Sequence, residues 1–228
     1  MHQKTLKSFM KHLRLWSFIT LFVLTISAFA EKHTEFYYQR ASLFELLPID
    51  STDIVFLGNS LTNGCEWHEL LGIPNVKNRG ISGDIVQGVD ERLTPVTKGH
   101  PAKIFFLTGV NDLSHDVPAD SVATAILNVV DRIHAESPET KVYVQSLLPI
   151  NNAFGRYKKV VGKEQDIIDI NATLAKECAN HGATWINLYP SFADENGNLR
   201  EDLTNDGLHL LGPGYLIWRD IVLPFVLE

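Results

Sequence analysis

A histidine and an acid near the C-terminus have the spacing of a catalytic acid–base pair. Asp206 and His209 lie three residues apart, so their side chains would face the same way if the segment made one helical turn. The carboxylate could then hold the imidazole in one tautomer, and the other ring nitrogen could take the proton of a serine hydroxyl. The serine that fits is Ser60, in the run GNSLTNG. Each residue also has a plainer interpretation: a helix cap for Ser60, a turn residue for Asp206 and a half-buried surface residue for His209.

Three hydrogen-bond donors could serve the same reaction. Gly83 offers a backbone N–H with no side chain in the way, Asn111 offers a side-chain NH₂ group, and the Ser60 N–H lies at an expected helix start. Donors aimed at one oxygen are what a tetrahedral oxyanion requires. Taken singly, Gly83 is better explained by a tight turn and Asn111 by an Asx turn. The assignment therefore depends on a fold that brings these residues together.

An alternation of strands and helices predicts such a fold. Strands are expected at 53–58, 103–109 and 141–150, and more weakly at 74–80 and 183–189. Helices are expected at about 60–71, 84–98, 119–137, 162–181 and 212–223, with a leading helix within 31–50. Continuous apolar strands that alternate with helices indicate a parallel sheet covered on both faces. We therefore expect one α/β domain of three layers.

The polar segments follow the ends of these expected strands. In open parallel sheets, ligands bind beyond the carboxyl ends of the strands. Ser60 follows the first strand, Gly83 the second and Asn111 the third, and the segment 206–209 comes after the fifth. All four would meet at one edge of the sheet. Two acids beside the proposed donors, Asp84 and Asp112, are expected to cap the helices that follow them.

Four blocks of this sequence resemble, in order, those of the SGNH hydrolases, also called the GDSL family. The blocks are GNSLTNG (58–64), NRGISGD (78–84), GVND (109–112) and DGLH (206–209). The resemblance covers the chain from about residue 53 to the C-terminus. It implies a flavodoxin-like sheet of five parallel strands in the order 2-1-3-4-5 and an activity that needs no metal or other cofactor. In one place the sequence departs from the pattern, because the first block has Asn59 where the family often has Asp.

The resemblance also implies the roles of the site residues. Ser60 would be the nucleophile, His209 the base and Asp206 the acid that orients it. The oxyanion hole would consist of the Ser60 N–H, the Gly83 N–H and the Asn111 side chain. Asn59 brings no charge, but it can still bond to the turn backbone. The Asp that the family often has at this position is not the acid of the triad, so its replacement by Asn leaves the triad complete.

The substrate is expected to be a small-molecule or glycan ester. The short chain resembles the branch that includes platelet-activating-factor acetylhydrolases and sialate or xylan O-acetylesterases, which favours an acetyl ester on an oligosaccharide. A lysophospholipid or a longer acyl ester is the alternative, and a non-catalytic glycan-binding module is a third. Three side chains of the run 151–163 could form a basic rim for an anionic substrate, or simply a solvated surface: Arg156, Lys158 and Lys159.

Composition and the N-terminus narrow the class of protein. The 228 residues carry 20 basic and 27 acidic side chains, a balance that argues against a nucleic-acid partner. Residues 1–30 have a basic start, a short apolar run and an Ala-Phe-Ala end, which is typical of a signal peptide. We expect an exported domain at 31–228 with no stable membrane insertion. An uncleaved anchor is the alternative, and the oligomeric state is left open.

The chain after the expected cleavage site is more acidic than the whole. Four of the basic residues and none of the acidic ones precede this site, so the remaining net charge is -11. The chain has two cysteines, Cys65 and Cys178, which could pair in an oxidising compartment. Their apolar neighbours favour two separate buried thiols instead.

Overall fold

The computed structural model describes residues 32–228. Within them, Glu35–Glu228 form one compact unit. The expected signal peptide at 1–30 lies outside the described residues, so the division of the chain at residue 30 stays a prediction. Among residues 32–228, none of the helices is both long and apolar enough to cross a membrane.

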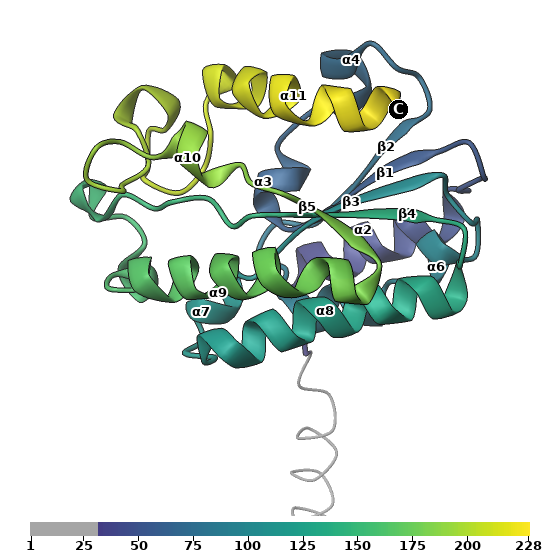
Figure 1. The fold of residues 1–228 in the computed structure, drawn as a ribbon, viewed down its shortest axis with the longest axis horizontal. Coiled ribbons are helices and arrows are strands. Elements are labelled where there is room, and N and C mark those ends of the chain that lie inside the picture. Colours follow the sequence, from purple (N-terminus) through teal and green to yellow (C-terminus); the bar gives the residue numbers. More distant parts are fainter. Residues whose placement is uncertain (1–31) are drawn as a thin grey trace, which may run out of the picture. The chain divides into compact units, whose positions relative to one another are not determined.

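Five strands form a single sheet in the order β2-β1-β3-β4-β5 (Figure 1). All four neighbouring pairs are parallel. The strands are β1 (Ile54–Gly58), β2 (Val76–Gly80), β3 (Lys103–Leu107), β4 (Lys141–Gln145) and β5 (Ala183–Ile186). β1 and β3 are buried along their whole length, as strands covered on both faces should be. The predicted fold class and strand order are confirmed.

Helices cover both faces of the sheet and enclose two separate cores. One core is packed between the sheet and α5 (Val86–Glu91), α6 (Thr94–Thr97), α7 (Val110–Leu113), α8 (Ala119–Glu136) and α9 (Glu164–Glu177). The other lies under α3 (Ser60–Asn63), α4 (Trp67–Leu71), α10 (Tyr189–Phe192) and α11 (Gly212–Leu227). Figure 1 shows α8 and α9 on one side of the sheet and α4 and α11 on the other. The leading helix is α2 (Glu35–Leu46), which buries Tyr37 and Phe44 around Ile81.

Two expected helices are each broken in two. The stretch 84–98 forms α5 and α6, separated before Pro95, which has no N–H to continue the helical ladder. The stretch 60–71 forms α3 and α4, with Gly64 between them. At Gly64 a Cβ atom would lie 2.6 Å from the Tyr215 hydroxyl of α11. The break therefore accommodates a side chain from another part of the chain.

The strand expected at 141–150 is also shorter than predicted. β4 ends at Gln145 rather than at residue 150. The Ser146 N–H still bonds to the Ile186 carbonyl of β5, but the backbone of Leu147 bonds to a side chain of α9 instead of to a strand. Asn171 accepts the Leu147 N–H at 2.8 Å and donates to the Leu147 carbonyl at 3.0 Å. The apolar residues beyond β4, such as Leu148 and Ile150, are buried in the core without belonging to the sheet.

The two cysteines are free and buried, as favoured by the sequence. Cys65 belongs to the core on the α11 side of the sheet and Cys178 to the core on the α8 side. The sheet therefore separates the two thiols.

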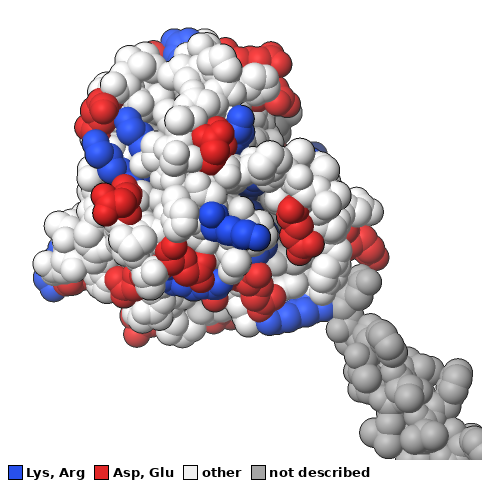
Figure 2. Space-filling model, turned by 90° about the vertical axis from the view of Figure 1, so that its right-hand side faces the viewer, with Lys and Arg blue, Asp and Glu red and all other residues white. Residues whose placement is uncertain are grey.

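Acidic and basic side chains are interspersed on the face of the described chain that Figure 2 shows. A nucleic-acid backbone is bound by a continuous basic surface. This face does not present one.

Candidate active site

Ser60 is held at the carboxyl end of β1 by a tight turn into α3. Asn59 caps this helix, because its side-chain oxygen accepts the Leu61 N–H at 3.0 Å. Asn59, although uncharged, thus makes the expected bond to the turn backbone. The turn begins at Gly58, where a Cβ atom would lie 2.1 Å from the Leu107 carbonyl oxygen of β3. Only glycine lets the two strands approach so closely here.

A chain of short hydrogen bonds links Ser60, His209 and Asp206. Ser60 Oγ lies 2.9 Å from His209 Nε2, and His209 Nδ1 lies 2.8 Å from Asp206 Oδ2. The network assigns the ring proton to Nδ1, which donates to the carboxylate and leaves Nε2 free to accept the serine proton. The serine and the histidine are 149 positions apart in the sequence. They meet because the segments after β1 and β5 leave the sheet at the same edge.

Asp206 and His209 are placed by a loop rather than by the helical turn that their spacing suggests. Asp206 Oδ1 accepts the backbone N–H groups of Leu208 at 2.9 Å and of His209 at 2.8 Å. Gly207 has a φ of +86°, and a Cβ atom there would lie 2.1 Å from the Asn151 carbonyl oxygen. Bonds from a side chain to the backbone therefore set the distance between the acid and the base.

The same bonds keep Asp206 ionised. Its side chain is 17% exposed, and this burial alone would raise the pKa of the carboxyl. Hydrogen bonds from the His209 ring and from the backbone N–H groups of His209 and Leu208 outweigh burial and lower the pKa to about 2. An anionic Asp206 can stabilise the positive charge that His209 gains when it accepts a proton.

The three donors expected for an oxyanion lie beside Ser60. Gly83 is the third residue of a turn from Ile81 to Asp84, closed by the Asp84 N–H to Ile81 carbonyl bond, and its φ of +81° suits glycine. Asn111 donates one of its two side-chain N–H groups to the Asp84 carbonyl at 2.8 Å, which leaves the other for the pocket. Within residues 32–228, no protein hydrogen bond uses the backbone N–H of Ser60 or Gly83.

The two acids beside these donors do not cap the helices that follow them, so this expectation was wrong. Asp84 forms a buried ion pair with Arg92, with Oδ2 and Nε 2.8 Å apart. Asp112 lies at 3.2 Å, through both carboxylate oxygens, from the Val86 N–H that begins α5. Asp112 thus caps a helix from an earlier part of the chain, because the loops after β2 and β3 are neighbours in space but not in sequence.

Seven of the eight predicted site residues line one pocket of about 560 Å³. Ser60, Gly83, Asn111 and His209 lie on it, and so do the three basic side chains Arg156, Lys158 and Lys159. Asp206 does not line the pocket, since it lies behind His209. The basic run thus belongs to the wall of the site, and its residues fold partly as the short helix η2 (Lys158–Val160).

Tyr157 and Arg92 are among the residues of the site that were not predicted. The Tyr157 hydroxyl donates to Asp206 Oδ2 at 3.1 Å. Tyr157 stands in the middle of the basic run that the sequence marks, but nothing in the sequence indicates where its hydroxyl points. Arg92 lies in a stretch predicted to be helix, where a charged residue is normally solvated.

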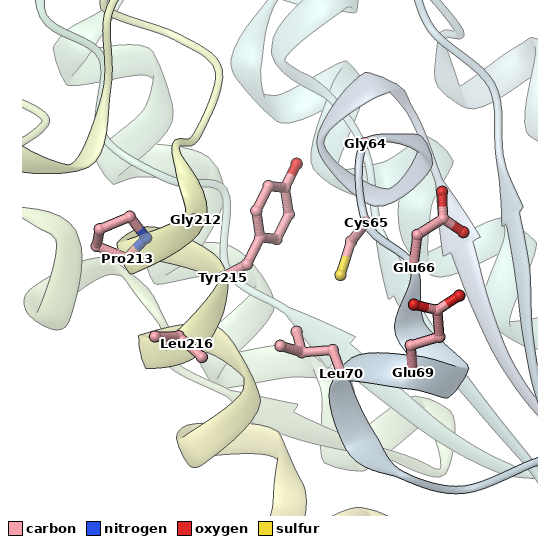
Figure 3. A pocket seen from close by; sticks show the side chains of 9 residues that line it. All are labelled: Gly64, Cys65, Glu66, Glu69, Leu70, Gly212, Pro213, Tyr215 and Leu216. Atoms are coloured by element: carbon pink, nitrogen blue, oxygen red, sulfur yellow. The ribbon is translucent and has the colours of Figure 1, made fainter.

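A second hollow of about 660 Å³ lies between α4 and the first turn of α11 (Figure 3). Cys65 and Glu69 line it, together with apolar side chains that include Leu70 and Tyr215. Burial raises the pKa of the Cys65 thiol to about 12, so this cysteine is not a nucleophile near neutral pH. Within residues 32–228, no group of three or more His, Cys, Asp or Glu side chains is gathered to hold a metal ion.

The fold and the site define a serine hydrolase of the acyl-ester class. Residues 56–217 match the model of the GDSL-like lipase/acylhydrolase family, and the chain belongs to this family. The resemblance seen in the four sequence blocks and the ester-hydrolase class are therefore confirmed.

Individual relatives agree with this assignment. The human platelet-activating factor acetylhydrolase IB subunit alpha1 is 28% identical over 183 residues, which cover 76% of this chain and 77% of the relative. A GDSL-like lipase from Bacteroides thetaiotaomicron superposes with a TM-score of 0.72 at 23% identity, covering 83% of this chain and 96% of that one. A mutant of an acetyl-xylooligosaccharide esterase from Geobacillus Stearmophilus gives 0.63 at 16% identity, over 79% of this chain and 96% of that one. The two structures show that the fold is shared.

Asp112→Asn is expected to change how stability depends on pH. Burial raises the pKa of Asp112 to about 6, from 3.8 for an ordinary aspartate. Between these values the folded state holds a proton that the unfolded state releases. The unfolding free energy of the wild type should therefore fall relative to that of the variant as pH rises from about 4 to about 7, by about 3 kcal/mol in all.

Urea unfolding of both proteins across this range measures the effect. The asparagine keeps an acceptor for the Val86 N–H, so the comparison isolates the charge. A difference between the two proteins that stays constant with pH would contradict the prediction.

Proposed function

We propose that the protein is an exported serine esterase that hydrolyses acetyl esters, in particular those carried by oligosaccharides. The proposal depends on one observation: the hydrogen-bonded chain from Ser60 through His209 to Asp206 opens onto the same pocket as Gly83 and Asn111. A nucleophile, its base, an orienting acid and oxyanion donors are the full set that acyl transfer requires.

The first half of the reaction forms an acyl-enzyme. Ser60 Oγ attacks the ester carbonyl carbon while His209 Nε2 takes the hydroxyl proton. The carbonyl oxygen becomes an oxyanion, which accepts hydrogen bonds from the N–H groups of Ser60 and Gly83 and from the Asn111 side chain. His209 then gives its proton to the departing alcohol oxygen as the bond from that oxygen to the carbonyl carbon breaks.

The second half repeats these steps with water. His209 takes a proton from the attacking water, and the same donors stabilise the second oxyanion. The bond from the acyl carbon to Ser60 Oγ then breaks, and the proton on His209 returns to the serine. The products are an alcohol and a carboxylic acid, and Asp206 remains an anion throughout.

Two observations support an acetyl ester as the substrate. The human relative is named an acetylhydrolase, and one structural neighbour is an acetyl-xylooligosaccharide esterase. A longer acyl chain or a lysophospholipid is the competing substrate. A series of aryl esters of increasing acyl length, alongside acetylated oligosaccharides, separates them, since activity that rises with chain length would displace the acetyl assignment.

Export is supported by the pattern of residues 1–30 alone. The intact mass of the chain recovered from outside the cytoplasm tests it. The expected mass is that of a chain that begins at Glu31. The mass of a chain that keeps residues 1–30 would indicate an uncleaved membrane anchor instead.

Ser60→Ala is expected to abolish esterase activity without unfolding the protein. Removing the nucleophile of a serine hydrolase can cost about 10⁶-fold in kcat. Hydrolysis of an aryl acetate and labelling by a fluorophosphonate should both be lost, with the melting temperature unchanged. A variant that kept more than a few per cent of wild-type turnover would remove Ser60 from this role. A wild type that neither hydrolyses nor labels would favour the glycan-binding module.

Asn111→Ala is expected to lower kcat far more than it raises KM. An oxyanion donor acts on the transition state, and losing one costs roughly 10²–10³-fold in rate. Steady-state kinetics with an aryl acetate measure both constants. An effect confined to KM would mean that Asn111 only positions the substrate.

Reversal of the two pocket lysines, Lys158→Glu with Lys159→Glu, is expected to discriminate between substrates by charge. The lysines oppose the acidic remainder of the chain, and a local positive field speeds the encounter with an anion. The value of kcat/KM should fall more for an acetylated sialoside than for a neutral acetylated xyloside. The difference should shrink with added salt, because the Debye length is about 8 Å at physiological ionic strength. Equal losses of kcat/KM on both substrates at every salt concentration would show that the lysines do not attract the substrate and only form a solvated surface.

A further inference from the structure

The Tyr157 hydroxyl lies against both members of the acid–base pair. It donates a hydrogen bond to Asp206 Oδ2 at 3.1 Å, and its oxygen lies 3.0 Å from His209 Nδ1. The Tyr157 and His209 rings meet edge to face, with centroids 5.4 Å apart and planes at 70°. The phenol, the carboxylate and the ring N–H thus form a closed triangle on the side of His209 away from Ser60.

The direction of the phenol dipole suits the charges of the reaction. The hydroxyl proton points at the carboxylate of Asp206, and the hydroxyl oxygen faces the Nδ1–H of His209. Burial raises the pKa of Tyr157, as does its hydrogen bond to Asp206, so the phenol keeps its proton near neutral pH. Positive charge that appears on His209 when Ser60 loses its proton therefore meets both an anion and the negative end of this dipole.

The triangle also connects the acid–base pair to the wall of the pocket. Tyr157 follows Arg156 and precedes Lys158 and Lys159, and all four side chains line the pocket that holds Ser60. The Asp206 carboxylate accepts hydrogen bonds from groups of its own loop, the Thr204 hydroxyl and the backbone N–H groups of Leu208 and His209. Tyr157 adds a contact from a separate segment, and this segment is the one that the substrate would meet.

We propose that Tyr157 is a positioning residue that fixes the His209 ring and stabilises its protonated state through the hydroxyl shared with Asp206. The proposal rests on the acyl-enzyme function proposed above. It predicts an effect on the chemical steps rather than on substrate binding, because both acylation and deacylation pass through protonated His209.

Tyr157→Phe tests the proposal, since phenylalanine keeps the ring against His209 and removes only the hydroxyl. With a small neutral aryl acetate, kcat should fall about 10-fold while KM stays within about twofold, the signature of an interaction made in the transition state. The rates are expressed per Ser60 that a fluorophosphonate can titrate, so that any unfolded fraction is left out. The matched control is Tyr38→Phe, which removes the hydroxyl of a tyrosine of similar overall exposure on α2 and should leave both constants unchanged.

The outcomes separate this proposal from the proposed function. If the wild type hydrolyses the ester through Ser60 and Tyr157→Phe has an unchanged kcat, the positioning role is overturned and the esterase stands. If Tyr157→Phe changes only KM, the hydroxyl contacts substrate and the positioning role is again overturned. If the wild type is inactive and Ser60 does not label, the proposed function fails first.

Discussion

The buried guanidinium of Arg92 joins the strand ends from which the site is built. It binds the Asp84 carboxylate through Nε at 2.8 Å, the Arg79 carbonyl through Nη1 at 2.9 Å and the Gly58 carbonyl through Nη2 at 3.0 Å. Gly58 ends β1 just before the turn to Ser60, and Arg79 lies at the end of β2. A desolvated charge is costly unless its donors are bonded, and burial accordingly lowers the pKa of Arg92.

The arrangement explains how a nucleophile and an oxyanion donor that follow different strands keep a fixed distance. Asp84 follows Gly83 directly, its carboxylate is held by Arg92, and its carbonyl accepts the Asn111 side chain. The loop after β2 is thus tied to the end of β1 on one side and to the loop after β3 on the other. Oxyanion donors are effective only when they are held in place before the charge develops, and this network supplies the rigidity.

Much of the fold followed from the sequence because its signals are local. The strands are continuous apolar runs, and the long helix α8 repeats its apolar residues at helical spacing. The strand order came from the resemblance, since alternation alone does not specify it. The breaks in the helices and the early end of β4 were missed because their causes include side chains from distant segments, such as Tyr215 and Asn171.

The residues of the site, too, divide into those that a local motif predicts and those whose contacts depend on the folded chain. Ser60, Asp206 and His209 could be named because their motifs are short and occur in order, and the parallel sheet brings their segments to one edge. The partners of Asp84 and Asp112 were misassigned because each acid was expected to cap the helix that follows it. Asp84 pairs instead with the side chain of Arg92, eight residues on, and Asp112 accepts the Val86 N–H of an earlier segment. Tyr157 was missed because the path of its loop, not its neighbours in the sequence, decides what its hydroxyl meets.

The position of the two thiols decides how the folded domain responds to oxidising and reducing conditions. Cys65 and Cys178 lie in cores on opposite sides of a five-stranded sheet, and the sequence contains no third cysteine. A disulfide between them would require the sheet to be opened. An oxidant therefore cannot form this disulfide in the folded domain, and a reductant has no disulfide to cleave. The folded domain therefore holds two separate buried thiols under reducing and under oxidising conditions alike.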